Sequence, residues 1–135
     1  MYTAAKLIPR PPESCWREFT DAGRLLAWLP GIRRVQVVAT TPEGLPLEVA
    51  FEFGGSRTYS LAYQYDAATR TVAWTPRSGQ RDAVRGSARF DPADAGTLVT
   101  YTVEDALVRP AAGRTPDDPA AILEAFAHWM ARTRP

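Results

Sequence analysis

A change of hydrophobic period near residue 32 constrains the fold of this chain more than any other feature. From Ile32 to Asp105, apolar and polar residues alternate with a period of two, which is typical of strands with one dry and one wet face. Turn-forming residues interrupt the alternation at 42–44, 54–55, 66–69, 78–79 and 91–96. The pattern therefore predicts six consecutive antiparallel strands.

The face predicted to be dry is rich in aromatic side chains. Its members are Leu47, Val49, Phe51 and Phe53; Tyr59, Leu61, Tyr63 and Tyr65; Val72 and Trp74; Val84, Gly86, Ala88 and Phe90; and Val99, Tyr101 and Val103. Glu48, Glu52, Arg85, Arg89 and Glu104 fall on the opposite face, where we expect a solvated surface of mixed charge.

Before this meander, the sequence predicts a strand and two short helices. The strand spans Thr3 to Ile8 and ends at a run of prolines, which cannot donate to a sheet ladder. The first helix opens near Pro12, with Cys15, Trp16 and Phe19 sharing one face at spacings of three and four. Asp21 is the expected N-cap of the second helix, whose apolar residues are Leu25, Leu26, Trp28 and Leu29 and which Pro30-Gly31 ends.

A longer helix is predicted from Pro119 to Thr133, with Asp118 as its cap. Its apolar side carries Ile122, Leu123, Phe126, Trp129 and Met130. The expected fold class is therefore α+β: a seven-stranded curved antiparallel sheet, two short helices after the first strand, and a long C-terminal helix packed across the sheet.

Composition indicates one folded domain spanning residues 1–135. Hydrophobic residues make up 45% of the chain and charged ones 23%, a balance typical of packed proteins. The net charge of +1 offers no field for nucleic acid, and no apolar run reaches the ~20 residues of a membrane span. We expect a cytoplasmic protein without stable membrane insertion, and the sequence leaves a homodimer open.

Reactive residues are scarce, so no catalytic residue, metal or cofactor is expected. His128, the single histidine, shares a helical face with Glu124 and Arg132, away from the apolar side. Cys15, the single cysteine, lies among core residues and is interpreted as a buried structural thiol. The chain also lacks a Gly-x-Ser-x-Gly nucleophile elbow.

Several short motifs resemble those of the START-like helix-grip superfamily, also called SRPBCC, which includes polyketide cyclases and the birch-pollen-allergen group. They are Pro11-Pro12-Glu13 leading to Trp16, Phe19-Thr20-Asp21, Trp28-Leu29-Pro30-Gly31-Ile32, Arg85-Gly86, Phe90-Asp91-Pro92 and the run from Gly96 to Tyr101. The resemblance covers essentially the whole chain. It implies a cavity between sheet and C-terminal helix that binds lipids, sterols, polyketides, quinones or plant hormones, in which some members catalyse cyclisation or hydrolysis.

The expected ligand-binding residues are the inward-facing side chains of the strands and of the last helix. They are Phe51, Phe53, Tyr59, Leu61, Tyr63, Trp74, Val84, Tyr101, Ile122, Phe126, Trp129 and Met130. Plain core packing is the alternative reading of the same pattern. The leading functional hypothesis is a noncatalytic carrier or sensor of a small hydrophobic molecule. Two alternatives stay open: a polyketide cyclase/dehydrase-type enzyme, and a protein-interaction module of the chaperone-activator or ribosome-association type.

Overall fold

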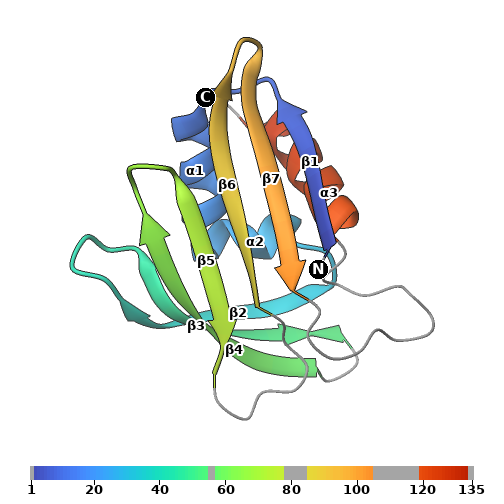
Figure 1. Cartoon of the computed structure of the whole chain (residues 1–135). Coiled ribbons are helices and arrows are strands. Elements are labelled where there is room, and N and C mark those ends of the chain that lie inside the picture. Colours follow the sequence, from blue (N-terminus) through green and yellow to red (C-terminus); the bar gives the residue numbers. More distant parts are fainter. Residues whose placement is uncertain (1, 55–56, 78–84, 105–118, 134–135) are drawn as a thin grey trace.

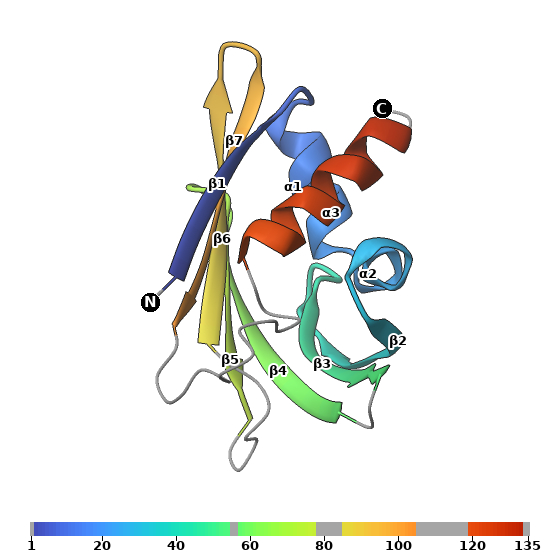
Figure 2. The ribbon, with the colours of Figure 1, turned by 90° about the vertical axis from the view of Figure 1, so that its right-hand side faces the viewer.

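Seven strands form one antiparallel sheet with three helices on its concave side (Figures 1 and 2). The computed structural model describes residues 2–54, 57–77, 85–104 and 119–133. The elements are β1 (Tyr2–Ile8), α1 (Pro12–Thr20), α2 (Ala22–Trp28), β2 (Ile32–Thr40), β3 (Pro46–Phe53), β4 (Arg57–Asp66), β5 (Thr71–Pro76), β6 (Arg85–Ala93), β7 (Gly96–Glu104) and α3 (Pro119–Arg132). This architecture confirms the predicted helix-grip fold class.

The strand order and the bend of the sheet bring the strands around the helices. Strands β2 to β7 pair with their sequence neighbours, and β1 adds to the free side of β7, giving the order β1-β7-β6-β5-β4-β3-β2. The sheet bends so that β3 and β4 curve beneath the helices (Figure 2). Helix α3 packs against β1 and β7, while α2 packs against β2 and α3.

Local sequence signals fix the ends of the short helices. Pro12 occupies the first turn of α1, where its missing amide is not needed. The Asp21 carboxylate accepts a hydrogen bond from the amide of Gly23 at 3.0 Å, which confirms the predicted N-cap of α2. Gly31, with φ +77°, turns the chain from α2 into β2. The cap predicted at Asp118 lies outside the described residues.

The predicted alternation holds in β5, β6, β7 and most of β3, but fails in β2, where irregularities interrupt the pairing with β3 and Val37 and Val38 are both exposed. Val49, Phe51 and Phe53 are buried, but Leu47 is 42% exposed because it stands at the start of β3, beside the β2–β3 turn. Leu26 is likewise exposed on the outer side of α2. On the wet face, arginines pair with carboxylates, in Arg34–Glu52, Arg77–Glu48 and Arg85–Glu104. These exposed pairs contribute little to stability.

Two polar side chains that the sequence did not single out fasten the helices. Glu18, only 4% exposed, accepts hydrogen bonds from Trp129 Nε1 at 2.9 Å and from Arg24 Nη1 at 3.2 Å, and so links α1, α3 and α2. Arg10 Nη1 donates to the carbonyl oxygens of Met130 at 2.8 Å and Thr133 at 3.0 Å. A cation at the last carbonyls of a helix satisfies them and complements the helix dipole.

None of the helices in the described ranges is long and apolar enough to cross a membrane.

The β6–β7 turn provides a test of this packing. Gly96 has φ +146°, and a Cβ there would collide with the backbone of Ile8, Pro9 and Arg10. Gly96→Ala should therefore lower the free energy of unfolding by more than about 2 kcal/mol, measured by urea denaturation. Gly44→Ala is the matched control, since Gly44 also has positive φ, at +92°, but has nothing within 4 Å of the added Cβ. It should cost only about 1 kcal/mol. Equal losses would contradict the close approach of the turn to the end of β1.

Candidate ligand-binding site

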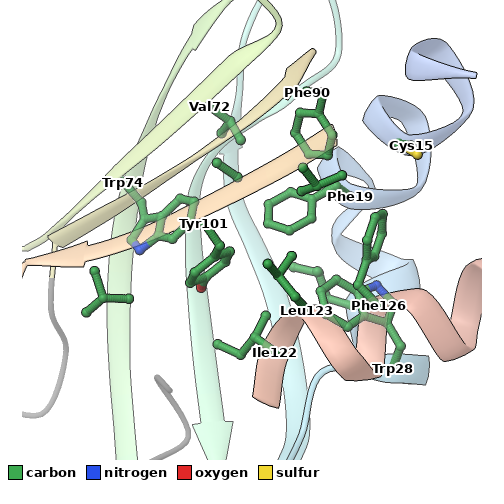
Figure 3. Close-up of a cluster of buried hydrophobic side chains, with 14 of the residues drawn as sticks. Cys15, Phe19, Trp28, Val72, Trp74, Phe90, Tyr101, Ile122, Leu123 and Phe126 are labelled. Atoms are coloured by element: carbon green, nitrogen blue, oxygen red, sulfur yellow. The ribbon is translucent and has the colours of Figure 1, made fainter. Parts of the chain in front are cut away.

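A small cavity lies between the sheet and the three helices. Its walls are Phe19 of α1, Leu25 and Trp28 of α2, Leu29, Phe51 and Phe53 of β3, Tyr59, Leu61 and Tyr63 of β4, Trp74 of β5, Tyr101 of β7 and Ile122 of α3. Figure 3 shows Trp74 and Tyr101 reaching from the sheet toward Ile122 on the helix. Side chains from all three helices and from four of the strands thus border one apolar space.

The interior is mostly filled. The cavity volume is about 50 Å³, whereas an engineered apolar cavity of about 150 Å³ binds benzene. The rings around it pack closely: Trp74 and Tyr101 have centroids 5.3 Å apart, and Phe53 and Tyr59 stack at 5.4 Å. Any guest larger than a few atoms therefore requires the lining side chains to move apart.

Eight of the twelve side chains predicted from the sequence line this cavity. They are Phe51, Phe53, Tyr59, Leu61, Tyr63, Trp74, Tyr101 and Ile122. Phe126 and Met130 are buried in the core without lining the cavity. Trp129 turns toward α1, where its indole N–H meets Glu18. Val84 lies outside the described residues.

Four further lining residues come from α1 and α2 and the turn that follows: Phe19, Leu25, Trp28 and Leu29. The sequence places these residues on the apolar sides of the two short helices. It does not show which part of the sheet or which other helix these sides contact. Only the contacts of α2 with β2 and α3 place Leu25 and Trp28 over the cavity. The sequence signal for this packing is the Trp28-Leu29-Pro30-Gly31-Ile32 motif, which carries the family resemblance but does not by itself place Trp28 in the cavity wall.

Gly86 makes room for one wall of the cavity. It lies directly opposite Trp74 in the β5–β6 ladder. A Cβ at this position would come within 2.8 Å of the Trp74 ring and of the Thr102 carbonyl oxygen. Glycine within a strand often marks such a close approach. The indole can therefore lie over β6.

The polar atoms of the lining are phenol hydroxyls and indole N–H groups. Loss of solvent raises the pKa of Tyr63 well above its ordinary value, and the neighbouring phenols of Tyr65 and Tyr59 act in the same direction. Tyr65, just outside the lining, donates to the Pro46 carbonyl oxygen at 2.5 Å. The Nε1 atom of Trp28 is buried and has no hydrogen-bond partner among the described residues.

Charged and nucleophilic groups lie elsewhere. The twelve described lining residues include no carboxylate, imidazole, thiol or amine. Cys15 is buried in α1, where burial raises the pKa of its thiol, and His128 is exposed on α3. Within the described ranges, no group of three or more His, Cys, Asp or Glu residues is placed to hold a metal ion. The lining can bind and orient an apolar molecule through neutral hydrogen bonds.

Comparison with protein families assigns the chain to a known family. Residues 2–132 match the model of the family described as polyketide cyclase / dehydrase and lipid transport. The chain belongs to this family. The match confirms the START-like resemblance of its motifs. No curated protein matches the sequence.

Solved structures with this fold are distant in sequence. TTHA0849 from Thermus thermophilus superimposes with a TM-score of 0.77 at 20% identity, over 97% of this chain and 98% of that one. A STAR-related lipid transfer protein from Xanthomonas axonopodis gives 0.71 at 16%, over 96% and 85%. The Zhui aromatase/cyclase from Streptomyces sp. R1128 gives 0.65 at 19%, over 96% and 85%. At these identities the likeness shows the fold alone.

Two neighbouring residues of α3 test the position of the cavity in this member of the polyketide cyclase / dehydrase and lipid transport family. Ile122 and Leu123 are both 2% exposed, but only Ile122 lines the cavity. Each change to alanine should cost about 2–5 kcal/mol of unfolding free energy. Ile122→Ala alone should enlarge the cavity toward a benzene-binding size. Saturating benzene should therefore raise the melting temperature of Ile122→Ala more than that of Leu123→Ala. Equal shifts would place the cavity elsewhere.

The partly buried phenols of Tyr63 and Tyr65 predict a loss of stability in alkali. Because the folded-state pKa of Tyr63 is raised, its contribution is fully present below pH ~10 and is lost as pH rises above that value. Tyr65 shifts in the same direction. Tyr63→Phe should reduce the fall in unfolding free energy between pH 9 and 12, and adding Tyr65→Phe should reduce it further, as followed by urea denaturation. An unchanged slope in both variants would show that the phenols are solvated.

Proposed function

We propose that this protein is a carrier or sensor that binds a small hydrophobic molecule in the cavity between the sheet and its helices. The observation that carries the proposal is the chemistry of the wall, whose twelve described side chains are all aliphatic or aromatic. Such walls, with a few neutral polar tips, suit apolar ligands. The family description, which includes lipid transport, supports the same role. We propose the cytoplasm as its location, since a single cysteine fits a reducing compartment.

Because the cavity is small, binding of a ligand requires the side chains of its wall to rearrange. A ligand that buries about 200 Å² of apolar surface gains roughly 5 kcal/mol from the hydrophobic effect, at about 25 cal/mol per Å². That gain has to exceed the cost of separating the packed rings of the wall. The lining residues on α2, Leu25 and Trp28, belong to a helix of only seven residues. We propose that the ligand lies between these residues and the aromatic strand residues Phe51, Tyr59 and Trp74.

A cyclase/dehydrase-type enzyme is the second candidate. The observation in its favour is the phenol of Tyr63, which lines the cavity. A neutral phenol can donate a hydrogen bond to oxygen that gains negative charge. Its raised pKa opposes a role as general base near neutral pH. In an enzyme, Tyr63→Phe and Tyr101→Phe would slow turnover more than they weaken binding, whereas a carrier would show an effect on binding only.

A protein-interaction module is the third candidate. It is favoured by the small cavity and by the exposure of Val37 and Val38 on β2, an edge strand of the sheet. Val38→Glu places a charge on this edge without touching the cavity. It would abolish capture of a protein partner in a pull-down and would leave binding of small molecules unchanged.

The binding proposal has a direct test. Gently purified protein is examined by native mass spectrometry for a copurified molecule, and a panel of lipids, quinones and aromatic polyketides is screened by thermal denaturation. A true ligand at 100 times its Kd should stabilise the fold by about 2.7 kcal/mol. It should also quench fluorescence from Trp28 and Trp74, which line the cavity, and the quenching should persist in Trp129→Phe. A panel without any stabilising compound, together with a mass spectrum of the bare chain, would remove the proposal's support.

A further inference from the structure

The indole N–H groups of Trp129 and Trp28 differ in their hydrogen bonding. Trp129 Nε1 donates to the carboxylate of Glu18 at 2.9 Å, so its hydrogen bond is satisfied within the fold. Trp28 is 7% exposed, and its Nε1 finds no acceptor in the described part of the chain. Buried N–H groups without a partner are rare in folded proteins. Nε and Nη2 of Arg10 are also buried without a partner among the described residues, but Arg10 does not line the cavity, whereas Trp28 does.

The surroundings of Trp28 hold its ring in place without supplying an acceptor. The ring packs against Phe126, with centroids 5.0 Å apart, and against Phe19 at 5.7 Å (Figure 3). Both neighbours are hydrocarbon. An indole nitrogen is a donor only, so its complement has to be an acceptor atom. Because Trp28 lines the cavity, a molecule bound there can provide one.

The rest of the wall restricts the charge of that acceptor. No cationic side chain belongs to the described lining, and the remaining polar atoms are neutral phenols and indoles. A carboxylate or phosphate in this space would lose its hydration without meeting a counter-charge. A ketone, quinone or ester oxygen has no such penalty, because it is uncharged.

We propose that Trp28 Nε1 donates a hydrogen bond to an uncharged acceptor oxygen of the bound molecule, and that this bond selects carbonyl-bearing ligands over hydrocarbons and over carboxylates. The inference rests on the proposed binding function and states which class of ligand the cavity prefers. Trp28 is then a specificity-determining residue.

Three probes of nearly equal shape separate these effects: acetophenone, ethylbenzene and benzoate at pH 7.5. The informative quantity is the ratio of the Kd of ethylbenzene to that of acetophenone, because it cancels the contribution of the shared ring. In Trp28→Phe this ratio should fall about five- to tenfold, the value of one neutral hydrogen bond. Benzoate should bind the wild-type protein at least tenfold more weakly than acetophenone.

Trp74→Phe is the matched control. It makes the same change of side chain elsewhere on the cavity wall and leaves Trp28 untouched. The ratio in Trp74→Phe should stay within about twofold of the wild-type value. An equal fall in both variants would assign the preference to the size of the cavity and would overturn the role of the Trp28 N–H.

Nuclear magnetic resonance gives a readout that does not depend on a variant's stability. The four tryptophans of the chain give four indole N–H resonances, and the one absent from Trp28→Phe belongs to Trp28. Acetophenone should move this resonance downfield in the wild-type protein, and ethylbenzene should not. If the probes bind with equal affinity and the resonance does not move, the inference fails while the binding function stands. If none of the three probes binds, both fail.

Discussion

The packing of the helices on the sheet depends on the contacts that the ring of Phe19 makes. It lies at the end of α1 and meets five other aromatic rings, with centroid distances of 5.3–6.3 Å, on α2, α3 and three strands: Trp28, Phe126, Trp74, Phe90 and Tyr101. Aromatic pairs of this kind contribute about 0.5–1.5 kcal/mol each beyond the area they bury. Because Phe19 also lines the cavity, the same ring holds the helices on the sheet and sets how much space remains between them.

The sequence predicts those parts of the fold that follow from local periodicity. Alternation along a strand depends on each residue's two faces, so Val49, Phe51 and Phe53 were assigned to the dry side correctly. Helix ends depend on neighbouring residues, and the Asp21 cap was found for this reason. The burial of Leu47 was wrong because alternation says nothing about where the covered part of a sheet ends.

The parts that the sequence does not reveal depend on contacts between distant segments. Trp129 shares the apolar side of α3 in a helical projection, but a buried carboxylate 111 residues away draws its N–H toward α1. The residues near Glu18 in the sequence do not indicate that its side chain is buried, since a glutamate in a short helix ordinarily faces water. The volume of the cavity is equally hidden, because it is the small difference between the space that the backbone encloses and the side chains that fill it.

The polar ties at Arg10 and Glu18 are unevenly placed along α3. They hold α3 near its C-terminal end, through Met130, Thr133 and Trp129, whereas the cavity borders Ile122 near the other end. At about 1.5 Å per residue, Ile122 lies roughly 12 Å along the helix from Met130. The polar ties of α3 to Arg10 and Glu18 are therefore separated along the helix from the side chain that borders the cavity. Near Ile122 the helix is held by apolar packing and by the exposed ion pair of Glu124 with Lys6. Directional hydrogen bonds thus fix one half of α3, and packing fixes the half beside the cavity.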